Sequence, residues 1–168
     1  MNSLLCVLLS LMAVFGAEAA YMTSFDQPFD FICPRGEALS YIGSENSNVH
    51  QDRVWEFRCR NAKVSRTCIK SDYVNEFDQL LAYMCRDNYV LTGVESYNDN
   101  AFSDRRFKFQ CCKPHNARFN NCTLTEALNK YDANFEYTVP AGHAILGIFS
   151  AHSDWFEDRV WKLYICRI

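Results

Sequence analysis

The sequence lacks the short motifs that identify the common classes of enzyme. It has no G-x-S-x-G nucleophile turn, no H-E-x-x-H helix, no P-loop and no glycine-rich dinucleotide turn. No acidic run resembles an EF-hand loop, and His50, His143 and His152 stand alone in turn or loop segments. These absences predict a protein that is not an enzyme and carries no cofactor. The alternative is a secreted hydrolase with a solvent-facing pair of carboxylates, which only distances can reveal.

Metal-ligand spacing and basic runs are also missing. The cysteines include no C-x2-C pair, and the tightest pair is the adjacent Cys111-Cys112, so we expect no metal site. Lys and Arg number 17 against 20 Asp and Glu, which gives a net charge of −3. These charges are spread along the chain. This spread argues against nucleic acid as a partner, because phosphate neutralisation dominates that kind of binding.

Long hydrophobic runs are absent except near the N-terminus. Residues 4–15 are almost wholly apolar, but this run is too short to span a bilayer. Ala17-Glu18-Ala19 then gives the small-x-small pattern of a signal-peptidase site. The sequence therefore predicts a signal peptide over residues 1–19 and a mature domain over residues 20–168. We expect a secreted protein that does not span the membrane.

Cysteine is abundant, with nine residues in the chain. Cleavage of the signal peptide removes Cys6 and leaves eight. An even number of cysteines in a secreted chain predicts a disulfide framework, here of four bonds. Eight cysteines can pair in on the order of a hundred ways, so the count alone does not assign the bonds.

One sequence pattern occurs three times. Each copy begins with an Asp-Arg pair and continues with alternating apolar and polar residues, at residues 52–57, 104–109 and 158–163. An aspartate also precedes each copy by 26 residues, at Asp26, Asp78 and Asp132. Both markers recur at intervals of 52 and then 54 residues. They indicate one unit used three times, over about residues 26–68, 78–122 and 132–168.

The alternation within these copies is typical of half-buried strands. Short strands with turn signals between them predict an all-β fold, a single disulfide-stapled domain of three pseudo-threefold repeats. A β-prism is favoured, because each unit shows three clear strands around a long polar loop, and a β-trefoil is the alternative. The polar loops are expected at residues 43–51, 95–103 and 150–157. A short helix is expected at residues 123–131, where Thr123 and Glu126 form a capping box.

The repeated motif has two interpretations. In the first it is a folding signature, in which the upstream Asp26, Asp78 and Asp132 anchor the three arginines, because a partly buried cation needs a carboxylate. In the second it forms three binding sites for acidic or sulfated glycans, with avidity for a polymeric ligand. The candidate residues are Asp52, Arg53, Trp55, Asp104, Arg105, Phe107, Asp158, Arg159 and Trp161.

Together these residues resemble the dermatopontin family of tyrosine-rich acidic matrix proteins, which includes invertebrate haemagglutinin and blood-cell aggregation factors. The likeness is carried by the three Asp-Arg copies, Cys33-Pro34-x-Gly36, Cys111-Cys112 and the closing segment at residues 161–167. It covers the mature chain from about residue 29 to residue 167. Phe107 departs from the pattern, because it replaces a Trp of the second copy.

The resemblance implies a non-enzymatic protein of the extracellular space or extracellular matrix. Such a protein would bind proteoglycans, glycosaminoglycans, matrix proteins or cell-surface glycans, support cell adhesion and influence collagen fibril organisation. The alternative is a soluble, lectin-like haemagglutinin or cell aggregation factor that acts in innate defence. Self-association is compatible with both readings.

The resemblance also implies a disulfide map. The family's cysteine pattern gives Cys33–Cys59, Cys68–Cys111, Cys85–Cys112 and Cys122–Cys166. The repeat offers a rival bond, Cys85–Cys111, because Cys111 stands where Cys59 stands in the first unit. The N-glycosylation sequon Asn121-Cys122-Thr123 has a cysteine at its centre that is expected to be bonded, so glycosylation of Asn121 is allowed but not favoured.

Overall fold

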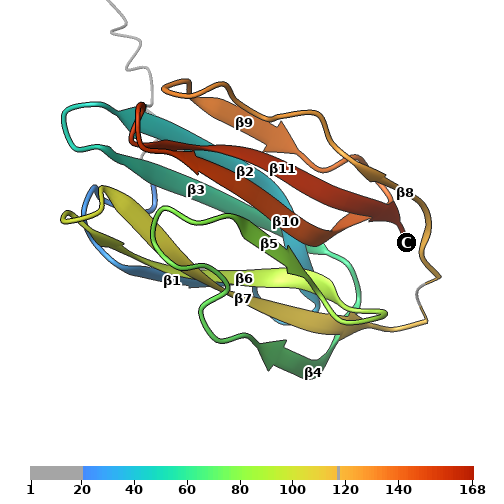
Figure 1. Ribbon diagram of the computed structural model, residues 1–168. Coiled ribbons are helices and arrows are strands. Elements are labelled where there is room, and N and C mark those ends of the chain that lie inside the picture. Colours follow the sequence, from blue (N-terminus) through green and yellow to red (C-terminus); the bar gives the residue numbers. More distant parts are fainter. Residues whose placement is uncertain (1–20, 117) are drawn as a thin grey trace, which may run out of the picture.

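The computed structural model describes residues 21–116 and 118–168, and strands, turns and irregular segments make up all of this part (Figure 1). The prediction of an all-β fold is therefore confirmed. No helix of the described residues could cross a membrane. The predicted signal peptide lies outside the described residues.

Eleven strands follow one another in the described part of the chain. They are β1 (Phe29–Ile32), β2 (Glu37–Ser47), β3 (Asp52–Asn61), β4 (Val64–Lys70), β5 (Leu81–Met84), β6 (Val90–Asp99), β7 (Asp104–Pro114), β8 (Asn120–Leu124), β9 (Phe135–Thr138), β10 (His143–Ser153) and β11 (Asp158–Arg167). The long strands form three antiparallel hairpins, β2–β3, β6–β7 and β10–β11. Each Asp-Arg pair begins the second strand of a hairpin.

Each hairpin is extended by a short strand from a different unit. The sheet orders are β1-β6-β7-β4, β5-β10-β11-β8 and β3-β2-β9. Strand β1 thus pairs with the second hairpin, β5 with the third, and β9 with the first. Because this exchange closes on itself, no unit completes its sheet alone. The β-prism and β-trefoil assignments stay predictions.

The hairpins are longer than the sequence suggested. Strands β2, β6 and β10 run into the segments that were expected to be polar loops, and the turns between strands occupy only residues 48–51, 100–103 and 154–157. The polar strand residues include Ser44, Ser96 and Ser150, which are 0%, 1% and 3% exposed. Small hydroxyl side chains fit an inward-facing strand position. All three tips lie at the left of Figure 1, and the C-terminus lies at the right.

The helix expected at residues 123–131 is absent, so that prediction is wrong. This segment includes the end of β8 and then runs without regular structure beside β11. The backbone N–H groups of Thr125 and Leu128 donate to the carbonyl oxygens of Leu163 and Trp161, each at 2.8 Å. Bonding to a neighbouring strand replaces the i to i−4 bonds that a helix needs. Tertiary pairing therefore overrides the capping signal.

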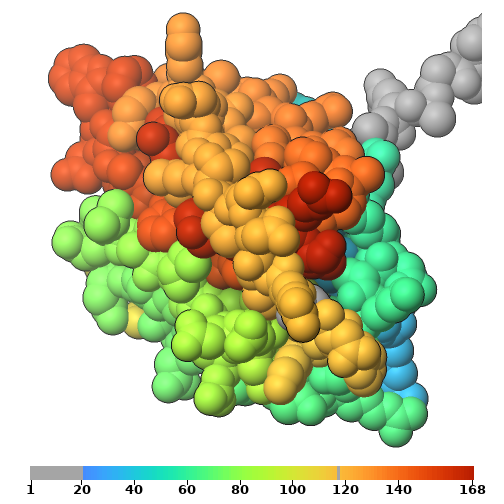
Figure 2. All heavy atoms as spheres, turned by 90° about the vertical axis from the view of Figure 1, so that its right-hand side faces the viewer, coloured from blue at the N-terminus to red at the C-terminus, as the bar shows by residue number. Residues whose placement is uncertain are grey.

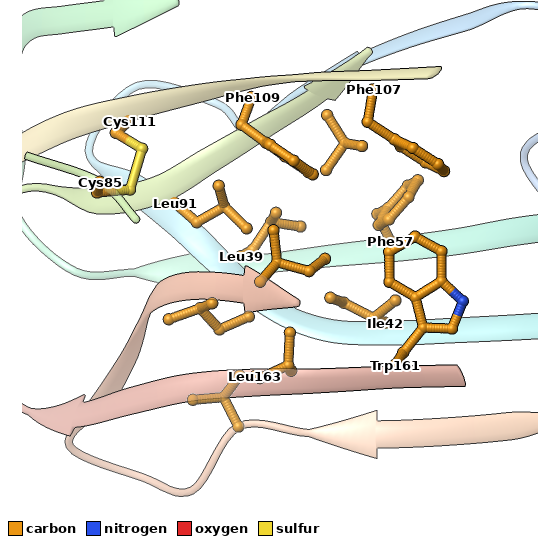
Figure 3. Packing of buried hydrophobic residues seen from close by; sticks show 14 of the residues in the cluster. Leu39, Ile42, Phe57, Cys85, Leu91, Phe107, Phe109, Cys111, Trp161 and Leu163 are labelled. Atoms are coloured by element: carbon orange, nitrogen blue, oxygen red, sulfur yellow. A yellow bond between two sulfur atoms is a disulfide. The ribbon is translucent and has the colours of Figure 1, made fainter. Parts of the chain in front are cut away.

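Aromatic rings fill the centre of the molecule. Trp55, Phe107 and Trp161 are 1–3% exposed, and their ring centroids lie 5.1–6.2 Å apart in edge-on contacts. Figure 3 shows Phe107, Trp161 and Phe57 at one end of the cluster and the Cys85–Cys111 disulfide at the other. Full burial of each large side chain contributes roughly 1.5–3 kcal/mol to folding. The rings come from all three hairpins, so they join the units.

Four disulfides link the described cysteines, and two of the implied bonds are confirmed: Cys33–Cys59 and Cys122–Cys166. The other two implied bonds, Cys68–Cys111 and Cys85–Cys112, are wrong. The structure forms Cys68–Cys112 and Cys85–Cys111, the second of which is the rival that the repeat offered.

Strand geometry explains the correction. Cys111 and Cys112 are adjacent on β7, so their side chains point to opposite faces of the sheet. Cys111 faces the main core, where Cys85 also lies. Cys112 faces a second, smaller cluster and stands directly opposite Cys68 on β4.

Candidate functional site

Each arginine of the repeated motif bonds the aspartate of a different copy. Its Nε and NH2 groups donate to the two carboxylate oxygens, a geometry that arginine suits well. The pairs and their Nε–Oδ1 distances are Arg53–Asp158 at 2.6 Å, Arg105–Asp52 at 2.5 Å and Arg159–Asp104 at 2.6 Å. The three pairs form a closed cycle, which we call the Asp–Arg cycle.

The aspartates 26 residues upstream are not the partners of the arginines, so that prediction is wrong. Asp26, Asp78 and Asp132 have φ values of 61°, 60° and 62°, in the left-handed region that aspartate tolerates better than most residues. Each backbone N–H donates to Oδ2 of the motif aspartate at 2.8 Å. The carbonyl group of the next residue accepts a bond from an arginine NH2. The upstream aspartate therefore marks a turn of the backbone.

The Asp–Arg cycle is buried. The guanidinium side chains of Arg53, Arg105 and Arg159 are each 4% exposed, and their partner carboxylates are 2% exposed. Charges in such positions are used inside the protein and are not presented to a large ligand. This geometry supports the folding-signature interpretation of the motif, and we look elsewhere for a surface that binds partners.

Rings decorate the tips of all three hairpins. At matching positions His50 stacks on Phe25, Phe102 on Phe77 and Phe156 on Tyr131, with ring centroids 4.5, 4.6 and 4.8 Å apart. Beside these pairs, Val49 and Trp155 are 90% and 88% exposed. Ser103 Oγ donates to Gln51 Oε1 at 3.0 Å, which joins two of the tips. Large apolar side chains this exposed mark a surface for interaction.

A cluster of titratable side chains lies beneath the tips. Donor atoms of Asp78, Asp104 and His152 lie within 4.8 Å of one another, a separation that a metal ion could bridge. Burial raises the pKa of the Asp78 carboxyl, while His152 lowers that pKa and Asp104 raises it. Asp104 already accepts two bonds from Arg159. Because that cation neutralises the carboxylate, the cluster is poorly suited to a metal ion.

The largest pocket lies at the other ends of the hairpins. It sits between the turn before β2 and the start of β4, and its volume is about 590 Å3, within the range of ligand sites. Ile32, Pro34 and Val64 contribute to its apolar wall, together with the Cys68–Cys112 disulfide. The pocket is therefore concave, partly apolar and held by a covalent bond.

Positive charge dominates the polar wall of this pocket. Arg35, Arg66 and His115 line it and are exposed, and Glu37 is the one acidic residue among its lining. Within residues 21–116 and 118–168, neither arginine forms an ion pair. We call this site the basic pocket.

The surroundings of the basic pocket are also cationic. Lys63, Lys113 and Arg118 are exposed on the segments that follow β3 and β7. Figure 2 looks at the end of the molecule opposite the tips, where the amber and orange segment after β7 lies across the middle of the face. The sequence did not single out this site, because its cations come from separate segments. Only the turn at Pro34-Arg35-Gly36 stood out, and as a family signature.

Comparison with known proteins agrees with the sequence pattern. The family model for dermatopontin matches residues 23–168. The chain is 43% identical over 148 residues to dermatopontin of Biomphalaria glabrata, covering 88% of this chain and 100% of that protein. It is 35% identical to the hemagglutinin/amebocyte aggregation factor of Limulus polyphemus, covering 89% and 88% of the two chains.

A third relative is Millepora cytotoxin-1 of Millepora dichotoma, 34% identical over 86% of this chain and 65% of that protein. No solved structure shows significant similarity. The matched family model covers nearly the whole described part, including all three copies of the Asp-Arg motif and all eight bonded cysteines. The chain therefore belongs to the dermatopontin family.

Proposed function

We propose that this protein is a secreted, non-enzymatic matrix or cell-adhesion protein that binds glycosaminoglycans and other acidic glycans at the basic pocket. The observation that carries the proposal is the pair of exposed arginines, Arg35 and Arg66, which lack a carboxylate partner in the described residues and line one concave site. Four disulfides support an extracellular location.

The chemistry of the basic pocket suits sulfate and carboxylate groups on a saccharide. A guanidinium group offers paired N–H donors that match two oxygens of an anionic group. The apolar wall gives the carbon face of a sugar ring a surface to cover. Because the whole chain carries a net charge of −3, attraction to a polyanion must come from local charge at this end.

The second candidate function is lectin-like binding of neutral sugars, which corresponds to the soluble aggregation-factor alternative. Trp155 supports it, because an 88% exposed indole at a hairpin tip offers a flat surface to a sugar ring. Asp154 and Glu157 flank this residue and could accept bonds from sugar hydroxyl groups. One relative carries the name hemagglutinin. Cross-linking of cells by either route also requires more than one site, through self-association or through two surfaces.

Binding of the mature protein to heparin and to a panel of neutral sugars, across a salt series, tests the proposal. Acidic glycans bound at the basic pocket should be released as salt rises, because ions screen exposed charges within about 10 Å at 0.1 M. Heparin binding that withstands salt and is blocked by a simple sugar would favour the lectin-like candidate. Absence of binding to both ligands would contradict both candidates.

A further inference from the structure

A small cavity lies where the three hairpins meet, between the tips and the central rings. Its volume is about 20 Å3, which holds one particle about the size of a water molecule. The Asp–Arg cycle, Trp55, Phe107 and Trp161 line it, and Gln51, Ser103 and Glu157 border it at the tips. We call this space the axial cavity.

Several buried N–H donors around the axial cavity have no acceptor. Among the described residues, these are the NH1 groups of Arg53 and Arg159 and the indole Nε1 groups of Trp55 and Trp161. The four side chains are all less than 5% exposed. The indole nitrogen of Trp161 points away from the leucine-rich part of the core (Figure 3). Unsatisfied buried donors are rare in folded proteins, and four around one cavity indicate a ligand that accepts hydrogen bonds.

Acceptors in the cavity wall are already used. Asp52, Asp104 and Asp158 each accept two bonds from an arginine and one from a backbone N–H. A water molecule must donate as well as accept, whereas an anion only accepts. The wall therefore has spare donors and occupied acceptors, a balance that suits an anion better than water.

Other titratable groups near the cavity belong to His152, Asp78 and Glu157. The Nε2 atom of His152 lies 3.8 Å from Glu157 Oε2, and its Nδ1 atom lies 3.7 Å from Asp78 Oδ1. Glu157 is partly exposed, with 31% of its side chain accessible, so solvent screens its charge. The donors of the arginines and indoles are buried and are not screened in this way.

We propose that the axial cavity binds a small monovalent anion of the halide class, held by Arg53, Arg159, Trp55 and Trp161. The anion would contact the first and third hairpins directly and would complete the hydrogen bonding of the Asp–Arg cycle. The second hairpin contributes fewer donors, because Phe107 stands where the others have Trp, and Arg105 NH1 is 3.2 Å from the carbonyl oxygen of Gln27. This inference is independent of glycan binding at the basic pocket.

Crystals of the mature protein soaked in sodium bromide test the site directly. The proposal predicts an anomalous bromide peak in the axial cavity. In solution, the thermal unfolding midpoint should be higher in sodium chloride or bromide than in sodium gluconate of the same ionic strength, because a ligand that binds only the folded state stabilises it. A cavity without bromide, together with equal midpoints in the three salts, would overturn the proposal in favour of water.

The repeat supplies matched variants. Trp161→Phe removes one donor, and Phe107 at the matching position shows that a phenyl ring fits there. Its halide-dependent shift should fall by at least half, whereas Phe107→Trp adds a donor and should enlarge the shift. Trp155→Phe changes an exposed indole away from the cavity lining and should leave it unchanged. Equal shifts in all four proteins would contradict the assigned donors, and Phe107→Trp still decides if Trp161→Phe fails to fold.

Discussion

Arg105, on β7, donates two hydrogen bonds to the carboxylate of Asp52, which begins β3. The two residues are 53 positions apart and belong to different hairpins. Asp52 also accepts the backbone N–H of Asp26, so one carboxylate joins the first turn, the first hairpin and the second hairpin. The same arrangement occurs at the other two copies, which makes the repeated motif a connection between units.

Loss of one arginine from the Asp–Arg cycle should destabilise the whole domain. Arg105→Ala leaves Asp52 buried and without its cation, and such a loss costs about 3–5 kcal/mol of unfolding free energy. Arg105→Lys should also destabilise the domain, because an ammonium group cannot reproduce the two-pronged bond. Urea unfolding measures both effects.

Arg58→Lys is the matched control for this experiment. Arg58 pairs with Glu56, but its side chain is 61% exposed, and exposed pairs contribute little. The unfolding midpoint of this variant should stay at the wild-type value. An Arg105→Lys protein as stable as the wild type would contradict the structural role of the cycle.

The sequence predicted the motif and the all-β class because both depend on local patterns. Alternation places Trp55, Phe107 and Trp161 inward, and the two markers at constant spacing reveal the repeat. It could not predict which copy bonds which, because the pairing of Arg53 with Asp158 spans 105 residues and depends on the closed exchange of strands. The upstream aspartates were misread for the same reason. Their spacing marked a turn, and nothing local separates a turn residue from an ionic partner.

The disulfides show a similar limit. Separation along the chain favoured Cys85–Cys111, which matches Cys33–Cys59 at 26 residues. The family pattern pointed to the other pairing, and only the two faces of β7 decide between Cys111 and Cys112. The basic pocket was beyond prediction, because Arg35, Arg66 and His115 converge only once β4 lies beside β7.

The disulfide map can be checked by digestion of the unreduced protein and mass spectrometry. Peptides that hold Cys68 and Cys112 should remain linked after cleavage between Cys111 and Cys112 by partial acid hydrolysis, and Cys85 should remain with Cys111. Replacement of both Cys68 and Cys112 by Ala should cost about 2–5 kcal/mol of stability. Recovery of a Cys85–Cys112 peptide would contradict the map.

Gly93→Ala should weaken the docking of β1 on the second hairpin. A Cβ atom at Gly93 would lie 2.9 Å from the carbonyl oxygen of Phe31, closer than the two atoms can approach. The backbone must shift, and overpacking of this kind costs about 1–3 kcal/mol. Urea unfolding measures the change, and a protein of unchanged stability would contradict the exchange of β1 between units.

The contact of Glu95 with Lys70 and Lys108 should make stability depend on pH. The Lys70 Nζ–Glu95 Oε2 distance is 2.5 Å, and the hydrogen bond from Lys70 is the main reason that the pKa of Glu95 lies below its usual value. The same bond raises the pKa of Lys70. A carboxyl with a lowered pKa contributes stability above the unfolded pKa, and this contribution is lost as pH falls through the folded pKa.

Glu95→Gln should therefore be less stable than the wild type between about pH 5 and pH 10, and the difference should shrink as the pH falls well below about 4. Unfolding in urea over a pH series measures the difference. Glu126→Gln, at an exposed carboxylate outside the ion pairs of the described residues, should give no such dependence. A constant difference between Glu95→Gln and the wild type at all pH values would contradict the assigned contact.

The affinity for heparin of a double variant tests the account most directly. Arg35→Ala with Arg66→Ala removes both guanidinium groups of the basic pocket, and Arg58→Ala with Lys130→Ala removes two exposed cations elsewhere. The account predicts that the first double variant, folded as shown by its unfolding midpoint, loses at least about tenfold in affinity, or about 1.4 kcal/mol. The second should lose much less. Equal losses in the two variants, or no loss in the first, would contradict a glycan site in the basic pocket.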